Sequence, residues 1–369
     1  MSTNGNALAG CLGASLQAIE VAKLISGNRA GSAVGSELLF DAASHAFVAS
    51  RLESNPDCRF AHERWEIATA GEGLTLRDAL SPGGAGARIF VPGSAFVSKL
   101  VCSACVRAEE SWRLRESLDE GSLRCPSCDG LRSVCGFDLV ERVAATWVPP
   151  ALLDRRLEAL GLRAGEVFGI AAEQGATRYL VLGTGTAAEL RAAAEPFGAT
   201  VVVAGLGNIG SFLAPLLARL PGVARLLLCD PDFYDENQVV GQDIEASAAG
   251  RGKAAIQAER LRRIRPELRV EAFASPVEQL PLGRLIGAIV VSCLDSRAAR
   301  LRLAARAWNV GSPFVDAAVG GGASLLTRTS VYRPDPGAAC FECSFDERDY
   351  AALEQVLPCA GSAAERAAA

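Results

Sequence analysis

The pattern of apolar and polar positions changes character about halfway along the chain. From residue 198 onward, short apolar runs rich in β-branched residues alternate with segments of helical length such as 251–264. The apolar runs cover residues 200–205, 225–230, 287–295 and 313–319. Fully apolar strands that alternate with helices are typical of a parallel sheet buried on both faces. The fold class we predict is therefore α/β, with a doubly wound, Rossmann-like, mostly parallel sheet.

The first half of the chain has a less regular pattern. Apolar residues recur at helical spacing over 15–27, and 36–42 resembles a short strand. Beyond these the chain is richer in charge and carries two pairs of cysteines, and a mixed connector with one strand-like run follows. We therefore expect four segments: a front segment 1–62, a small cysteine-rich domain 63–150, a connector 151–197 and a nucleotide-binding part 198–369.

Composition narrows the class of protein. A net charge of −5 and a pI near 5.4 do not favour nucleic-acid binding through a basic surface. No basic n-region precedes the first apolar stretch, which Glu20 and Lys23 interrupt, and no apolar run approaches a membrane span. Twelve cysteines without an export signal favour metal binding over disulfides. We expect a cytoplasmic protein with neither membrane nor nucleic acid as partner.

A glycine-rich loop marks the candidate nucleotide site. Gly205, Gly207 and Gly210 have G-x-G-x-x-G spacing directly after a predicted strand and before a helix. Such glycines allow a tight turn, the approach of a phosphate and close helix packing, while the helix N-terminus favours negative charge. Asp230, at the end of the next strand, is placed to accept hydrogen bonds from ribose hydroxyls. A Rossmann-like sheet that binds no ligand remains the alternative.

The polar residues after this loop favour ATP over a nicotinamide cofactor. Asp232, Asn237 and Gln242 follow within twelve residues of Asp230, and Lys253 is placed to neutralise charge on the α-phosphate. Asp295 ends another strand, at the edge where such sheets bind ligands, and is most simply a magnesium ligand. An NAD-dependent oxidoreductase would leave these residues unexplained.

Four cysteines predict a zinc ribbon. Their spacing is C-x₂-C-x₁₉-C-x₂-C, which is typical of two zinc knuckles, whereas a redox pair would begin a helix in a thioredoxin-like pattern. The expected ligands are Cys102, Cys105, Cys125 and Cys128.

These motifs together resemble the ubiquitin-activating-enzyme-like adenylyltransferases of the ThiF/MoeB superfamily over roughly 150 residues. The resemblance implies that Asp230 holds the ribose, that Asn237 and Lys253 contact phosphates, and that Asp295 holds Mg²⁺. Two positions depart from the pattern. The arginine expected just before Gln242 is Gly241, and an asparagine after Asp295 is Ser296. The missing arginine normally helps to hold the triphosphate.

The resemblance also explains the front segment. In similar proteins the sheet is followed by a C-x-x-C, a further cysteine, a helix, a strand and a second cysteine pair. This chain has Cys340, Cys343 and Cys359 near its end, and the helix, the strand and Cys58 at its front. We therefore predict a circularly permuted adenylation domain with new termini after Cys359. Exchange of residues 1–62 between subunits is the alternative.

The same resemblance implies a second zinc site. Cys58, Cys340 and Cys343 are present, but the fourth cysteine is replaced by Ala61, and we expect the neighbouring His62 to complete a Cys₃His set. Cys359 is a candidate nucleophile for thioester formation or sulfur transfer, and an incidental loop cysteine is the alternative.

The leading functional hypothesis is an ATP-dependent adenylyltransferase with Mg²⁺ and two Zn²⁺ sites. Its catalytic residues would be Lys253, Asp295 and Asn237, with Cys359 as a further candidate. By resemblance the substrate is the C-terminal carboxylate of a ubiquitin-like or sulfur-carrier protein, or of a precursor peptide, and the enzyme is a homodimer. A catalytically impaired scaffold that binds a peptide or carrier protein for another enzyme is the alternative.

Overall fold

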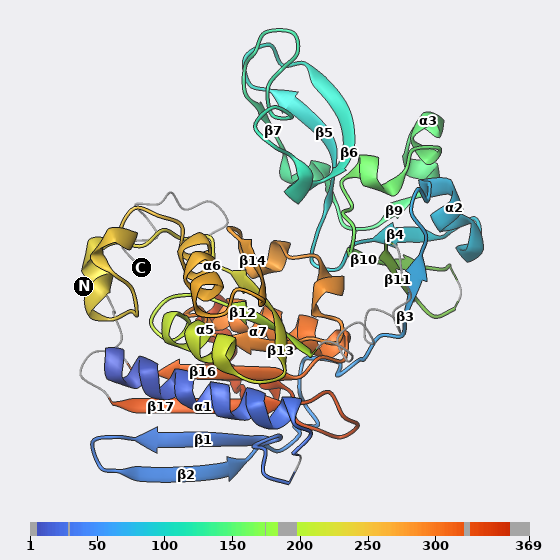
Figure 1. The fold of residues 1–369 in the computed structure, drawn as a ribbon. Helices are drawn as coiled ribbons and strands as arrows, with labels where there is room; N and C mark the ends of the chain where they lie inside the picture. The colour runs from blue at the N-terminus through green and yellow to red at the C-terminus, as the bar shows by residue number, and fades with distance from the viewer. Residues whose placement is uncertain (1–5, 29, 174, 184–197, 321–324, 355–369) are drawn as a thin grey trace. The chain divides into compact units, whose positions relative to one another are not determined.

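The computed structural model describes residues 6–28, 30–173, 175–183, 198–320 and 325–354, and the chain divides into two compact units. Figure 1 shows the course of the chain through both. The first unit combines the front of the chain with its second half and consists of Met1–Arg64, Arg191–Leu280 and Leu285–Ala369. The second consists of Trp65–Leu190 and Pro281–Arg284.

An eight-stranded sheet forms the centre of the first unit, in the order β14-β13-β12-β15-β16-β17-β1-β2. The first five strands in this order are parallel, and β17, β1 and β2 continue the sheet antiparallel. The fold class predicted from the apolar runs is confirmed. The strands are β12 (Ala199–Ala204), β13 (Val223–Cys229), β14 (Arg269–Phe273), β15 (Ile289–Ser292), β16 (Phe314–Val319), β17 (Leu326–Tyr332), β1 (Ser36–Asp41) and β2 (Ala46–Arg51).

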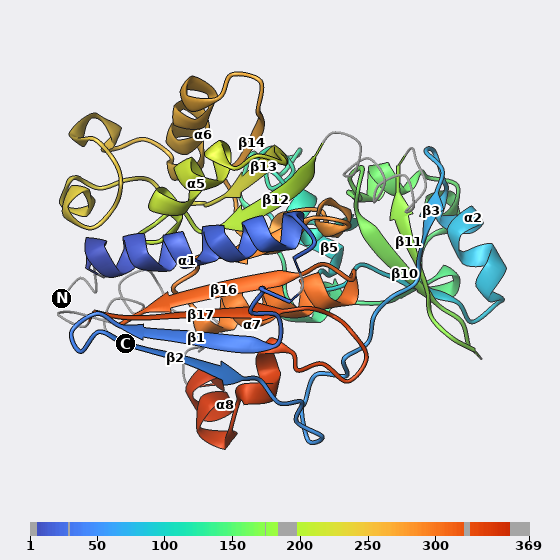
Figure 2. The same cartoon turned by 60° about the horizontal axis from the view of Figure 1, so that its bottom comes forward.

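Helices cover both faces of this sheet. The helices α1 (Ala7–Ile25), α5 (Gly210–Arg219) and α6 (Lys253–Ile264) share one core with the strands, and α1 runs along β16 and β17 (Figure 2). The helix α7 (Arg297–Asn309) joins β15 to β16, so the reversal of strand order at β12 places it on the opposite face. The segments η10 (Phe341–Ser344) and α8 (Glu347–Glu354) follow the last strand, and η10 contacts α7.

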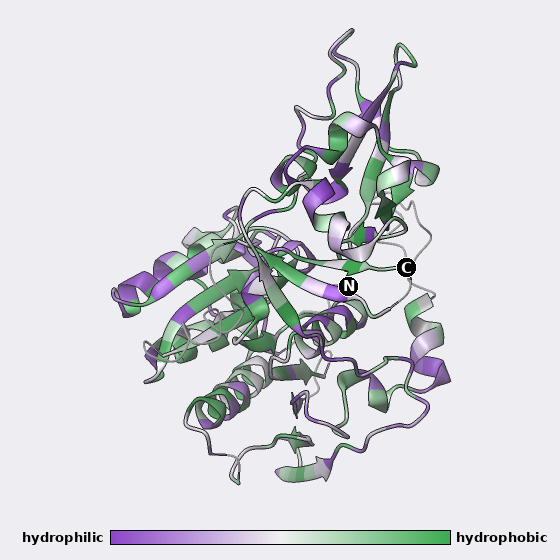
Figure 3. Ribbon diagram, turned by 90° about the vertical axis from the view of Figure 1, so that its right-hand side faces the viewer, coloured by the Kyte–Doolittle hydropathy of each residue, from purple (hydrophilic) through white to green (hydrophobic). Residues whose placement is uncertain are grey.

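Burial explains which residues form these elements. Val201, Val203, Leu226 and Leu228 are fully buried between sheet and helices, which explains the apolar runs in β12 and β13. Figure 3 shows the hydropathy of the residues along the ribbon. By length and composition, α1 is a described helix apolar enough to cross a membrane, a test that buried core helices also pass. Since its inner face packs in the core with α5, β16 and β17, we assign α1 to the core.

Short 3₁₀ segments carry the polar loops of the first unit. They are η6 (Glu236–Val240), η7 (Ala246–Ala248) and η8 (Val277–Gln279). A further segment, η9 (Leu282–Leu285), has its first three residues in the second unit.

The second unit contains two sheets. Its five-stranded sheet has the order β3-β11-β10-β4-β9, and a smaller one is formed by β5, β6, β7 and β8. The strands are β3 (Ile67–Ala70), β4 (Arg88–Phe90), β5 (Phe96–Cys102), β6 (Ala108–Leu114), β7 (Arg132–Ser133), β8 (Leu139–Val140), β9 (Val143–Ala144), β10 (Val167–Ala171) and β11 (Arg178–Leu182). The helical segments are α2 (Leu76–Leu80), η1 (Ser81–Gly83), η2 (Arg115–Ser117), η3 (Gly136–Asp138), η4 (Ala145–Trp147), α3 (Pro150–Leu153) and η5 (Leu157–Leu160).

The expected segments 63–150 and 151–197 share this second unit. The segment that composition suggested as a connector supplies β10 and β11, and these strands pair with β4 and β3 of the preceding segment. One core joins them, including Phe168, Ile89 and Leu157. Strand pairing between distant segments is not visible in composition, so the sequence pattern separated what the fold joins.

Candidate nucleotide site and metal centres

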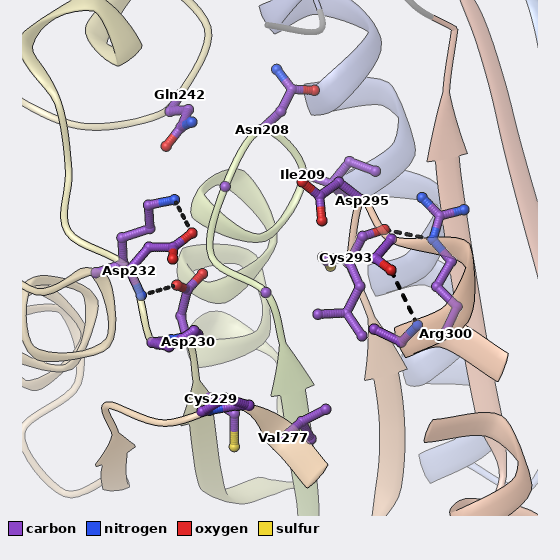
Figure 4. A pocket seen from close by; sticks show the side chains of 18 of the residues that line it. Asn208, Ile209, Cys229, Asp230, Asp232, Gln242, Val277, Cys293, Asp295 and Arg300 are labelled. Carbon is purple, nitrogen blue, oxygen red and sulfur yellow. Dashed lines mark hydrogen bonds and ion pairs between the residues drawn. The ribbon is translucent and has the colours of Figure 1, made fainter. Parts of the chain in front are cut away.

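A cavity of about 690 Å³ opens at the carboxyl ends of the parallel strands in the first unit (Figure 4). The glycine loop, the ends of β13 and β15, η8 and the start of α7 line it. It lies where the strand order reverses between β12 and β15, which is the ligand position in doubly wound sheets. Most of the predicted nucleotide residues line it: Gly205, Gly207, Asp230, Asp232, Gln242, Lys253 and Asp295.

The glycine loop has the geometry that its spacing predicts. Gly205 has a φ of 88°, and a Cβ there would lie 2.6 Å from the Cys293 carbonyl oxygen. In front of Gly207, the nearest atom to such a Cβ is Gln242 Nε2 at 3.9 Å, which leaves room for a ligand against the backbone. At Gly210 a Cβ would collide with the Gly205 carbonyl, so the helix packs closely on the turn.

Asp230 holds the glycine loop and the residues after β13 through backbone hydrogen bonds. Its carboxylate accepts hydrogen bonds from the backbone N–H of Leu206 at 2.6 Å and of Asp232 at 2.9 Å. The side chain is buried, and burial raises the pKa of Asp230 above its usual value. Each oxygen accepts one of these bonds and retains a second lone pair for a ribose hydroxyl.

Tyr234 holds the other backbone group of the same residue, the carbonyl of Leu206. Its hydroxyl donates to the Leu206 carbonyl at 2.9 Å and accepts from Gln257 Nε2 on α6 at 3.0 Å. Tyr234 and Gln257 are both buried, and burial raises the pKa of Tyr234, so the hydroxyl keeps its proton. Leu206 is therefore held through both its N–H and its carbonyl. Sequence reasoning gave no role to Tyr234 or Gln257, because no motif contains them.

Lys253 is the first residue of α6 and is almost fully buried. Its ammonium group lies 3.2 Å from a carboxylate oxygen of Asp232, whose side chain is two-thirds exposed, and 5.8 Å from the centre of the Tyr234 ring. A buried lysine with one exposed partner can exchange that partner for a phosphate that enters the cavity.

Asp295 follows β15 at the rim of the cavity and is exposed. Within the described residues it has no hydrogen bond or ion pair, so both oxygens are available to a cation. Arg300, one turn further along α7, donates from Nε to the Leu294 carbonyl at 2.5 Å and lies 3.7 Å from Asp316. It thereby supports the turn that carries Asp295.

The loop opposite Lys253 differs from the expectation at one residue. Asn237 does not line the cavity: it is exposed, and its amide bonds Asp235 at 2.8 Å. Its neighbour Gln238 lines the cavity instead. Two consecutive polar residues in a 3₁₀ turn face different directions, and spacing alone did not decide between them. At Gly241 the carbonyl accepts a 2.6 Å hydrogen bond from Asn208 Nδ2 of the glycine loop.

The ribbon cysteines lie together in the second unit. The sulfur atoms of Cys102 and Cys128 are 3.5 Å apart, and those of Cys105 and Cys125 are 3.7 Å apart. A tetrahedral Zn–S bond of about 2.3 Å predicts about 3.8 Å between sulfur atoms, so the four residues could hold zinc. Backbone N–H groups of Cys105 and Ala104 point at the Cys102 sulfur and lower its pKa to about 6, which favours the thiolate that binds metal.

The second group joins the front segment to the end of the first unit. Cys340 Sγ lies 3.8 Å from the sulfur atoms of both Cys58 and Cys343, and His62 Nε2 lies 3.3 Å from Cys343 Sγ. The ring of His62 packs against Trp308, with 5.3 Å between centroids, in a small apolar cluster around the cysteines. This Cys₃His set could also hold zinc. Cys359, the candidate nucleophile, lies outside the described residues.

The sheet, the glycine loop and the cavity define a Rossmann-like domain with a candidate nucleotide site where the strand order reverses. Residues 195–365, a little under half of the chain, match the ThiF family.

A search of curated proteins found no match. Among solved structures, the chain is similar to E. coli MccB with succinimide at 20% identity, covering 46% of this chain and 52% of that chain with a TM-score of 0.34. It is also similar to the E. coli tRNA N6-threonylcarbamoyladenosine dehydratase TcdA at 28% identity, covering 36% of this chain and 56% of that chain with a TM-score of 0.30. The chain thus spans about half the length of these structures.

Proposed function

We propose that this protein binds ATP with Mg²⁺ and adenylates the C-terminal carboxylate of a ubiquitin-like or sulfur-carrier protein, or of a precursor peptide. The observation that carries the proposal is the single cavity that gathers the glycine loop, Asp230, Lys253 and Asp295 at the reversal of strand order. The match of this region to the ThiF family also supports adenylation. The proposal includes a homodimer, which the resemblance implies, and the cytoplasmic location expected from the composition.

The residues of the cavity divide the work of such a reaction. The substrate carboxylate oxygen forms a bond to the α-phosphorus, the bond to the β-phosphate bridge breaks, and pyrophosphate leaves. Lys253, released from Asp232, stabilises charge at the α-phosphate, and Gln242, which lines the cavity, is placed toward the phosphates. Asp230 and the backbone of Gly207 position the ribose and phosphates. Asp295, as a lone carboxylate beside a polyphosphate, fits Mg²⁺, which would neutralise the departing pyrophosphate.

We also propose that the adenylation domain is circularly permuted. The front segment supplies α1 to the core, β1 to the sheet edge beside β17, and Cys58 with His62 to the second cysteine group. These are the places that the closing segment of a MoeB-like protein would take. In the single chain that the structure describes, the segment packs on its own unit. Exchange of residues 1–62 between subunits is the alternative arrangement of the same contacts.

One observation favours the scaffold alternative. The cavity lacks a guanidinium at Gly241, and the described arginines that line it are engaged: Arg300 with Leu294 and Asp316, and Arg302 with Glu278. A protein that binds a carrier or peptide for another enzyme would not need this charge. The enzyme and the scaffold differ in whether ATP is turned over.

The test is magnesium-dependent ATP binding by calorimetry, together with ATP–pyrophosphate exchange in the presence of candidate carboxylate peptides. Asp295→Ala removes the proposed magnesium ligand, and Asp335→Ala removes an exposed aspartate elsewhere in the same unit as a matched control. We expect wild type and Asp335→Ala to bind ATP and Asp295→Ala to lose the magnesium dependence. ATP binding without exchange for any peptide would favour the scaffold, and no ATP binding by folded wild type would refute both the enzyme and its site.

A further inference from the structure

The helix α1 contacts the wall of the nucleotide cavity at two separate points, through Asn208 and through Cys293. The first is Gly10, which is buried against the glycine loop. A Cβ at Gly10 would lie 2.5 Å from both the backbone oxygen and Oδ1 of Asn208. Asn208 in turn lines the cavity (Figure 4), and its Nδ2 donates to the Gly241 carbonyl. The absence of a side chain at Gly10 therefore sets how close the loop can lie to the helix.

The second point is Gln17, two turns further along α1 and fully buried. Its Nε2 donates to the Ser292 carbonyl at 2.9 Å, and its Oε1 accepts from the Cys293 thiol at 3.4 Å. Ser292 is the last residue of β15, and Cys293, which follows it, precedes Asp295 by two positions. Burial raises the pKa of Cys293, so the thiol keeps the proton that it donates. Gln17 thereby fixes the backbone from which the proposed magnesium ligand projects.

The rest of α1 is anchored in the core, so the positions of Gly10 and Gln17 are fixed. Ala14, Ala18 and Val21 are buried in the core, and the Thr327 hydroxyl of β17 donates to the Ala9 carbonyl at 3.2 Å. Between the two contacts lies Gly13, whose surroundings differ: a Cβ there would meet the Thr327 methyl at 3.3 Å and no part of the glycine loop. The helix is thus built with one glycine against the loop and one against the sheet.

We propose that α1 is a positioning element of the nucleotide site, with Gly10 setting the glycine loop and Gln17 setting the turn that carries Asp295. The expected effect on ATP binding rests on the proposed function. The expected effect on the glycine loop does not, because it can be measured without any ligand. Neither Gly10 nor Gln17 lines the cavity, so both act through other residues.

The experiment compares Gly10→Ala with Gly13→Ala on the full chain. Both substitutions raise helix propensity to the same degree, and only the first places a methyl against Asn208. Amide hydrogen exchange of residues 205–210 is measured without ligand, and the Kd for MgATP by calorimetry. We expect Gly10→Ala to speed exchange of the loop and to raise the Kd at least about tenfold, while Gly13→Ala stays within about twofold of wild type.

Gln17→Leu keeps the packing volume, removes both hydrogen bonds, and provides a second test if Gly10→Ala does not fold. It is expected to raise the magnesium concentration needed for half-maximal ATP binding by about tenfold, with loop exchange near wild type. Equal loop exchange and equal ATP binding in wild type, Gly10→Ala and Gln17→Leu would overturn the inference. If wild type binds no ATP but Gly10→Ala alone speeds loop exchange, the positioning role stands and the proposed function fails.

Discussion

His62 and His45 are the only histidines of the chain, and they allow a matched test of the second metal centre. His62 Nε2 faces Cys343, whereas His45 lies in the exposed turn between β1 and β2. Both residues have a left-handed backbone, with φ of 52° and 57° respectively. Replacing either by alanine therefore changes backbone strain to a similar degree, and only His62→Ala removes a proposed zinc ligand.

The expected magnitude follows from the position of the ligands in the chain. Cys58 and Cys340 are 282 residues apart in sequence. If a metal cross-link acts on the unfolded chain as a disulfide would, closing such a loop contributes about 5–6 kcal/mol. His62→Ala leaves three thiolates that still bind zinc, and we expect the affinity to fall about 100-fold, or about 2.7 kcal/mol. For a unit of this size that loss lowers the melting temperature by roughly 5–10 °C.

The assay is zinc per chain by mass spectrometry after dialysis against a weak chelator. Thermal unfolding is measured separately, on undialysed protein with zinc in excess, so that the change in affinity appears as the change in stability. Wild type and His45→Ala should retain two zinc ions per chain, and His62→Ala should retain the one in the ribbon group of the second unit. The ribbon group thus serves as an internal reference. The reasoning is refuted if His62→Ala keeps both zinc ions and has the same melting temperature as His45→Ala.

Two further predictions concern buried polar groups. Tyr234→Phe leaves the buried Leu206 carbonyl without its hydroxyl donor, so we expect a loss of about 1–3 kcal/mol in unfolding free energy and weaker ATP binding. Tyr350→Phe, which removes a hydroxyl bonded to Glu342 away from the cavity, should leave ATP binding unchanged in the same calorimetric titration. Asp316 is fully buried, with Arg300 at 3.7 Å and Arg328 at 3.8 Å, and the effect of burial exceeds that of these arginines and raises its pKa above 3.8. Folding therefore favours the protonated carboxyl group, and the wild type should lose unfolding free energy as the pH rises from about 4 through the raised pKa. Asp316→Asn cannot ionise at this position, so urea unfolding of both proteins across that pH range measures the difference. A constant difference between the two proteins across that pH range would contradict this.

The sequence carried enough information to predict the sheet and the residues at its edge. The apolar runs of β12, β13, β15 and β16 are buried on both faces, and such strands have an unmistakable composition. The glycine loop and the cysteine pairs are recognised by the spacing of residues that lie close together in the sequence. The strand pairing of the second unit is different, since it depends on contacts between residues that are far apart in the chain.

Side-chain direction marks the limit of this reasoning within the site. Asn237 and Gln238 are neighbours of similar chemistry, and the 3₁₀ turn directs only the second one into the cavity. Tyr234 and Gln257 belong to no motif, although they fix the peptide of Leu206. Such residues become visible only when the partner of each buried polar group is sought, because an unpaired group in the core is costly.

The structure also gives a physical reason why the order of segments along the chain matters less than their contacts. β1 pairs with β17 from Ser36 opposite Val331 to Asp41 opposite Leu326, so the front segment adds to the sheet by antiparallel hydrogen bonds that need no particular connection. Contacts of such long sequence separation are entropically costly to form. The Cys₃His group lies beyond this strand pair and joins the same two parts of the chain. A zinc ion there would reduce that cost by holding residues 58–62 against 340–343 while α1 settles over the glycine loop. Removal of zinc should therefore loosen α1 and raise the Kd for MgATP together, although the metal and the nucleotide site share no residue.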